Sequence, residues 1–185
     1  MTRTTKLFAA AALGIVLGAS ACHNDQLFRP ANFVPIDPLF ERYVSMGNSI
    51  TAGFQSAGIN DSTQAQAYPV LLANAMQSPF FGPYLNRPGC PPPFTNAFTQ
   101  ARVGGGTPAT CALRKPQSPP PPFVSNTAVP GAEVLDIYSN LDTASNANAL
   151  TTFILGGLTQ TQMLLHADPT FVTVWIGNKI GRAHV

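Results

Sequence analysis

The six residues at positions 171–176, FVTVWI, are apolar except for Thr173, and Gly177 follows them. Such a run is typical of a strand that is buried on both faces of a parallel sheet. Two other segments, Arg42–Met46 and Phe123–Ala128, have the β-branched and aromatic content of further strands. Helical patterns lie between these segments. The chain therefore alternates strand and helix, which predicts an α/β fold.

The expected helices are recognised by apolar residues at helical spacing. They are Ser62–Met76, Ala132–Tyr138, Asn148–Leu155 and Gln160–His166, the last two separated by Gly156 and Gly157. Pro69 lies inside the first of them. Because proline is favoured at the first position of a helix, the true start is expected near Tyr68.

A long proline-rich stretch, Gln77–Pro122, has no helical or strand periodicity. We call residues 79–122 the excursion, and we expect it to be an ordered surface loop that helps to shape access to a cleft. It contains Cys90 and Cys111, which are expected to form a disulfide in an oxidising compartment. A metal site is the alternative, but no cluster of His or Cys stands nearby to complete it.

The N-terminus has the pattern of an export signal. Arg3 and Lys6 precede an apolar run, Leu7–Gly18, that is too short to cross a bilayer. The run leads into GASAC, which resembles a bacterial lipobox, although Ala19 stands where Leu is usual. We therefore expect residues 1–21 to be a lipoprotein signal peptide and Cys22 to carry the lipid. The alternative is ordinary cleavage after Ala21, which leaves a free Cys22. In either case the protein is exported, and the first reading anchors it to a membrane of the cell envelope.

The charge balance argues against nucleic acid as a partner. The whole chain has a formal charge of +2, but residues 22–178 hold six Lys or Arg against eight Asp or Glu. Nucleic-acid binding needs a basic surface that neutralises phosphates, and a charged membrane surface has the same requirement. Neither is expected here. The polar, proline-punctuated residues 22–40 are interpreted as a tether.

Three segments at strand ends carry the chemical interest. Ser49 follows the first strand in Gly47-Asn48-Ser49, Gly131 follows the second in NTAVPGA, and VWIGN closes the third. A serine in such a turn is a weak nucleophile without a base, and by itself the pattern is more often only a turn. However, ligands of open α/β sheets bind outside the carboxyl ends of the strands. One site is expected to collect all three segments.

Together these segments resemble the SGNH, or GDSL-type, hydrolase family, in its bacterial lipoprotein group. GNSITAG is similar to the first family block, NTAVPGA to the second and VWIGN to the opening of the third, over residues 41–178. The resemblance implies a three-layer α/β/α domain with a parallel, flavodoxin-like sheet. It implies hydrolysis of an ester through an acyl-enzyme, with Ser49 as nucleophile. The N–H groups of Ser49 and Gly131 would be oxyanion-hole donors. No metal or organic cofactor is implied.

The chain departs from the family pattern in three places. Asn48 stands where the family usually has Asp, a position outside the catalytic triad, and Lys179 stands where the third block has Asn. The last block, Asp-x-x-His, which supplies the base and its acid, is absent from the chain. None of the three histidines replaces it, because His23 lies beside the lipid site, His184 lies at the chain end, and His166 precedes Asp168 in the wrong order. The alternative function is a surface lipoprotein that uses this fold to bind a ligand or partner without catalysis.

The last seven residues, KIGRAHV, are expected to be foreign to the protein. Ile180–Val185 can be encoded as ATC GGA AGA GCA CAC GTC, which, preceded by AG, matches a common sequencing adapter. The AG would complete AAG, the codon for Lys179. The break falls inside the third block, so native sequence is expected to stop at Asn178, which makes the chain an N-terminal fragment. A true C-terminus is the alternative. A fragment of this kind is expected to be inactive and poorly stable.

Overall fold

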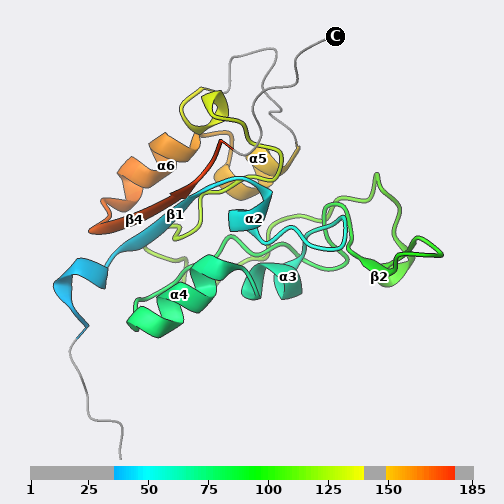
Figure 1. Ribbon diagram of the computed structural model, residues 1–185, viewed down its shortest axis with the longest axis horizontal. Coiled ribbons are helices and arrows are strands. Elements are labelled where there is room, and N and C mark those ends of the chain that lie inside the picture. The colour runs from blue at the N-terminus through cyan, green and yellow to red at the C-terminus, as the bar shows by residue number, and fades with distance from the viewer. Residues whose placement is uncertain (1–35, 140–148, 178–185) are drawn as a thin grey trace, which may run out of the picture. The chain divides into compact units, whose positions relative to one another are not determined.

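The structure is a computed structural model that describes residues 36–139 and 149–177 (Figure 1). The predicted signal peptide, Cys22, most of the predicted tether, Asn178 and the tail 179–185 lie outside the described residues. Within them the helices and strands follow one another in the order shown in Figure 1. The elements are η2 (Pro38–Phe40), β1 (Tyr43–Gly47), α2 (Ser49–Ala52), α3 (Asp61–Ala65), α4 (Tyr68–Met76), β2 (Phe94–Asn96), β3 (Ala101–Arg102), η3 (Val103–Gly105), η4 (Leu135–Ile137), α5 (Ala149–Leu155), α6 (Gln160–Ala167) and β4 (Phe171–Trp175).

A small parallel sheet organises these elements. β1 pairs with β4 in register from Tyr43 opposite Phe171 to Gly47 opposite Trp175. On the other side of β1, residues 125–129 run parallel to it and exchange backbone hydrogen bonds with Ser45 and Gly47. Sequence segments far apart in the chain thus meet around β1. The combination of helices with a parallel sheet is an α/β arrangement, as the alternating pattern predicts.

Helices flank the β1–β4 pair on both sides. In Figure 1, α6 lies on one side of the pair and α4 on the other. Gln160 at the start of α6 bonds to Gly47, and the Tyr68 ring of α4 lies 6.1 Å from the Trp175 ring of β4. The largest side chains that are fully buried come from several elements and include Tyr43, Ile59, Leu85, Ile154 and Leu155. None of the helices in residues 36–139 and 149–177 has the length and apolar content that a bilayer crossing requires.

The burial of β4 corrects one expectation. The apolar run was expected to be covered on both faces, but Val174 and Trp175 are 54% and 50% exposed. Among the described residues β4 pairs with β1 alone, so it lies at the edge of the sheet. Hydrophobic sequence predicts that a strand prefers burial, but burial itself depends on which neighbours cover it.

Two predicted helices are also shorter than expected. The stretch Ser62–Met76 divides into α3 and α4, and Ala67, with φ −64° and ψ 145°, is the extended residue before Tyr68 and Pro69. The helix therefore starts at Tyr68, with proline at its second position. Ala132–Tyr138 contains only the short η4, in which the Asp136 carboxylate accepts a hydrogen bond from the Glu133 N–H at 2.7 Å.

The excursion is built against the loop that follows α2. A disulfide joins Cys90 to Cys111, and the β2–β3 hairpin lies within the loop that it closes. Ile59 pairs with the excursion through Ile59 N–H to Pro91 O and Cys90 N–H to Ile59 O, both 2.9 Å. Near its start, Phe81 exchanges hydrogen bonds with Ser125, beside β1. The excursion is thus an ordered part of the domain.

Candidate active site

The turn that leaves β1 depends on a glycine. Gly47 has φ +151°, and a Cβ on it would lie 2.4 Å from both the Thr51 Oγ1 and the Trp175 carbonyl oxygen. Buried Asn48 follows, donates its N–H to the Trp175 carbonyl at 3.3 Å, and accepts the Ile50 N–H on its side chain at 3.3 Å. Asn48 is therefore the N-cap of α2, and Ser49 is the first residue of that helix.

The strand register brings the three predicted segments to one level. The Val129 N–H donates to the Gly47 carbonyl at 3.2 Å, and Trp175 is the partner of Gly47 in β4. Ser49, Gly131 and Gly177 each follow two residues later. All three positions therefore lie just beyond the carboxyl ends of neighbouring parallel segments, which is where sites of open α/β sheets form.

The two predicted oxyanion donors are free within the described chain. Neither the Ser49 N–H nor the Gly131 N–H donates a hydrogen bond to a residue in 36–139 or 149–177. Gly131 has φ +94°, a conformation that favours glycine, and it is partly exposed. Two unpaired N–H groups at one edge of a sheet have the chemistry needed to stabilise a developing negative charge.

The Ser49 hydroxyl has no hydrogen-bond partner among the residues that the structure describes. His166 is the one histidine in this part of the chain, and the fold places it far from Ser49. It lies in the last turn of α6, next to Asp168, which forms an ion pair of 2.9 Å with Arg42 just before β1. Ser49 follows the C-terminal end of β1, whereas the ion pair lies at its N-terminal end. The length of the strand, roughly 13 Å at 3.3 Å per residue, therefore separates Ser49 from this end of α6.

Two further residues, Gln160 and Asn126, hold this edge together. Gln160 is almost fully buried, and its amide side chain binds both backbone polar groups of Gly47 at 2.8 Å. Asn126 donates to the Thr51 carbonyl at 2.8 Å and accepts from the Ala128 N–H at 3.1 Å. Asn126 is the first residue of NTAVPGA, so the sequence motif already indicated that it lies near the site. Gln160 follows a helix cap, and no local pattern distinguishes it from an exposed glutamine.

Hydroxyl groups of further residues lie in the surrounding elements. The Thr51 hydroxyl and the Tyr68 hydroxyl lie 3.4 Å apart beneath α2. Burial raises the pKa of Tyr43 above its ordinary value of 10.0, and a hydrogen bond of 2.8 Å to the Thr173 hydroxyl acts in the opposite direction. Within residues 36–139 and 149–177, no group of three or more His, Cys, Asp or Glu could hold a metal ion.

Comparisons with protein-family models, with curated proteins and with solved structures return no match for the chain.

Proposed function

We propose that this protein is a serine ester hydrolase of the SGNH type, with Ser49 as its nucleophile. The observation that carries the proposal is the strand register. Gly47 and Val129 are joined by a hydrogen bond, and Ser49 and Gly131 each follow two residues later. Both N–H groups are free among the described residues, and both residues follow the carboxyl ends of adjacent parallel segments. This arrangement suits a reaction in which a carbonyl oxygen becomes negative.

The proposed reaction proceeds through an acyl-enzyme. The Ser49 oxygen attacks the ester carbonyl carbon, its proton passes to a base, and the N–H groups of Ser49 and Gly131 bind the oxyanion. The C–O bond to the alcohol then breaks, and the alcohol leaves with the proton from the base. Water, activated by the same base, hydrolyses the acyl-enzyme and regenerates Ser49. No metal or organic cofactor takes part.

The base and its acid are proposed to come from an Asp-x-x-His segment encoded beyond Asn178. His166 does not fit this role, since it lies at the opposite end of the strands from Ser49. Sequencing the gene across the codon for Asn178 tests the proposal. The frame is expected to continue as Asn-Asp and later to reach Asp-x-x-His. A stop after Val185 would leave Ser49 without a base and would favour the non-catalytic alternative.

The finer fold is proposed to be a three-layer α/β/α domain with a flavodoxin-like parallel sheet. The position of α4 and α6 on opposite sides of the β1–β4 pair supports it (Figure 1). The half-exposed apolar residues Val174 and Trp175 agree with a sheet that extends past β4.

The cellular location is proposed to be the cell envelope, with the protein anchored through a lipid on Cys22. The disulfide between Cys90 and Cys111 supports an exported protein, because such bonds persist in oxidising compartments. Nucleic acid is not proposed as a partner.

A non-catalytic surface lipoprotein is the second candidate. The specific observation in its favour is that the Ser49 hydroxyl has no partner among the described residues. Asn48, in place of the usual Asp, agrees with it. In this reading the same edge of the sheet binds a ligand and does not cleave it.

An esterase assay distinguishes the two candidates. The product of the complete gene is expected to hydrolyse p-nitrophenyl acetate, and Ser49→Ala is expected to lower kcat by about a thousandfold or more. Ser56→Ala, at an exposed serine in the following loop, is the matched control and should keep full activity. Equal rates for the complete protein and Ser49→Ala would contradict the esterase proposal.

A further inference from the structure

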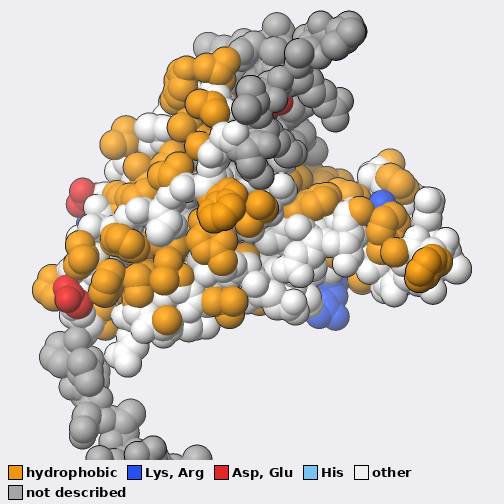
Figure 2. Space-filling view, in the orientation of Figure 1, with side chains coloured by type: hydrophobic (Ala, Val, Ile, Leu, Met, Phe, Trp, Pro, Cys, Tyr) orange, Lys and Arg blue, Asp and Glu red, His pale blue; other side chains and the backbone are white. Residues whose placement is uncertain are grey.

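The cations of the described chain are concentrated in the excursion. Residues 79–122 contain four basic residues and no Asp or Glu, and Arg42 is the one other cation in the described part. In Figure 2 the Lys and Arg side chains of this face lie mainly on the right, the side of the β2–β3 hairpin. The net charge of the whole sequence does not reveal this local concentration of positive charge.

One of the four cations, Arg102, supports the excursion itself. Its guanidinium lies 4.0 Å from the centre of the Phe94 ring and donates to the carbonyls of Ala57 and Pro92. Arg114 is half-buried and donates to the Ile154 carbonyl at 3.4 Å, whereas the side chains of Arg87 and Lys115 are mostly exposed.

Two of these cations face a single carboxylate. Asp61, at the start of α3, lies 3.1 Å from the Arg87 Nε and 3.9 Å from the Lys115 Nζ. Because one negative charge meets two positive charges, the cluster keeps a net positive charge. The side chains of Arg87 and Lys115 are more than half exposed, so they are accessible to a ligand.

Lys115 also joins two hollows in the surface. The first, of about 310 Å³, is lined by Asp61, Ser62, Ala65, Tyr84 and Lys115. The second, of about 300 Å³, is lined by Arg114, Lys115, Pro116, Gln117, Pro120 and Pro121. Lys115 lines both hollows, and we call the two together the Lys115 groove.

The walls of the Lys115 groove are fixed by backbone pairing. The Lys115 N–H donates to the Tyr84 carbonyl at 2.7 Å, and the Asn86 N–H donates to the Leu113 carbonyl at 2.9 Å. The Gln117 side chain donates to the Gly82 carbonyl at 2.9 Å. A groove between paired segments is largely formed before a ligand arrives, which lowers the entropic cost of binding.

We propose that the Lys115 groove binds an acidic oligosaccharide. The Tyr84 ring and the prolines offer flat apolar surfaces to the C–H faces of sugar rings. Asp61, Ser62 and Gln117 supply hydrogen-bonding groups for hydroxyls, and Lys115 with Arg114 supplies positive charge for carboxylates. The charged residues Asp61, Arg114 and Lys115 in the lining do not suit an acyl chain.

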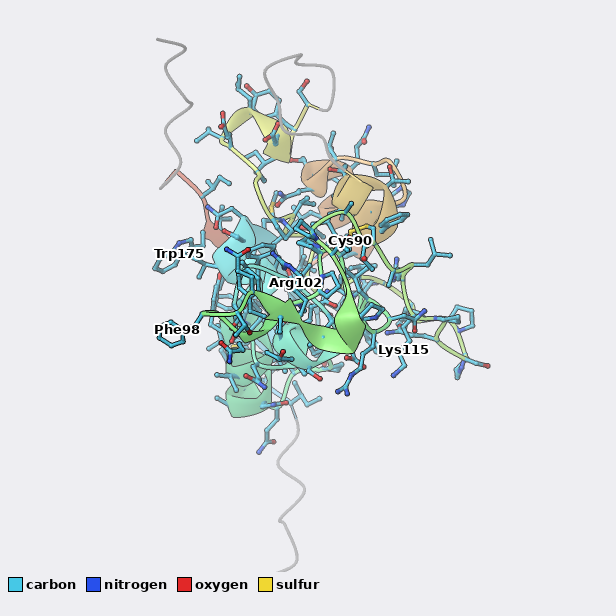
Figure 3. All side chains as sticks on the ribbon, turned by 90° about the vertical axis from the view of Figure 1, so that its right-hand side faces the viewer. Cys90, Phe98, Arg102, Lys115 and Trp175 are labelled. Atoms are coloured by element: carbon cyan, nitrogen blue, oxygen red, sulfur yellow. A yellow bond between two sulfur atoms is a disulfide. The ribbon has the colours of Figure 1, made fainter. Side chains whose placement is uncertain are left out.

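The groove is separate from the proposed catalytic edge. In Figure 3, Lys115 and Trp175, the residue that ends β4, lie on opposite sides of the view. The inference therefore stands apart from the proposed esterase activity, and its readout is binding alone.

Titration calorimetry of the purified full chain with an oligogalacturonate tests the inference. A neutral galactan oligosaccharide of equal length and vesicles of phosphatidylglycerol are the comparison ligands. We expect binding of the oligogalacturonate that weakens with added salt, and little binding of the neutral sugar or the vesicles. Lys115→Gln is expected to weaken it roughly three- to tenfold, and Lys115→Arg to leave it within about twofold.

Arg42→Gln is the matched control, because it removes the same charge outside the groove, and thermal unfolding shows that each variant folds. The control should bind as the unchanged chain does. Several outcomes would overturn the inference: no binding of oligogalacturonate, equal binding of the neutral sugar, preference for the vesicles, or an equal loss in Arg42→Gln and Lys115→Gln.

Discussion

The Gln160 side chain binds both backbone polar groups of Gly47. The Gly47 N–H donates to the Gln160 Oε1 at 2.8 Å, and the Gln160 Nε2 donates to the Gly47 carbonyl at 2.8 Å. The Gly47 carbonyl also accepts the Val129 N–H at 3.2 Å. The two Gln160 bonds fix the start of α6 to the turn that carries Ser49, two residues beyond Gly47.

Truncation of Gln160 should therefore destabilise the fold. In Gln160→Ala the buried Gly47 N–H loses its partner, while the carbonyl keeps the bond from Val129. We expect the free energy of unfolding to fall by about 2 kcal/mol, measured by urea denaturation. Gln66→Ala, at an exposed glutamine, should change it by less than about 0.5 kcal/mol. Equal effects of the two substitutions would show that the contact does not stabilise the turn.

The turn should tolerate no side chain at Gly47. The Cβ in Gly47→Ala would lie 2.4 Å from the Trp175 carbonyl oxygen, and the backbone there must shift to relieve the overlap. A loss of about 3 kcal/mol or more is expected in the same denaturation experiment. Gly156→Ala is the control, because Gly156 also has a positive φ, +63°, but nothing lies within 4 Å of its Cβ position. Its cost should be only about 1 kcal/mol, the backbone term alone.

The disulfide should stabilise the whole domain, since the excursion pairs with Ile59 and Ser125. Cys90 and Cys111 are 21 residues apart, and a closed loop of this length is worth about 3 kcal/mol in the chain-entropy model. Reduction with dithiothreitol and the double substitution Cys90→Ser with Cys111→Ser should lower the denaturation midpoint equally. A midpoint that does not respond to reduction would contradict this expectation.

Stability should depend on alkaline pH through Tyr43. Burial raises the pKa of Tyr43 in the folded protein, so the folded state holds its proton more tightly than the unfolded chain does. This contribution is fully present below about pH 10, the ordinary pKa, and is lost as pH rises through the folded pKa. Burial raises the pKa of Tyr84 in the same direction.

Tyr43→Phe tests this dependence. At neutral pH the substitution should cost about 1 kcal/mol, because the hydrogen bond to Thr173 is lost. Above pH 10 deprotonation of Tyr43 destabilises the unchanged protein, whereas Tyr43→Phe has no hydroxyl at this position to deprotonate. The difference between their free energies of unfolding should therefore narrow as the pH rises. A constant difference from pH 8 to pH 11 would contradict the assignment.

Much of the fold was predictable because its signals are local. β1, the break at Gly156 and Gly157, and the start of a helix at Tyr68 all follow from residues within a few positions. The parallel pairing of β1 with β4 agrees with the α/β pattern, since strands separated by helices tend to pair in this way.

The remaining features depend on contacts between distant residues. The exposure of Trp175 depends on what lies beside β4, and Gln160 acts on a residue 113 positions away. The Lys115 groove joins Asp61 to the excursion, and neither segment alone suggests a site. For the candidate active site, the motifs placed Ser49 and Gly131 at one edge, but the support beneath them came from the structure.

Labelling with a fluorophosphonate tests the central claim, that Ser49 is an activated nucleophile. The product of the complete gene is treated with the probe, and the modified peptide is identified by mass spectrometry. We expect one labelled serine, Ser49, and no labelling in Ser49→Ala or in protein unfolded beforehand. A folded protein whose Ser49 stays unmodified, or a label that persists in Ser49→Ala, would contradict the account.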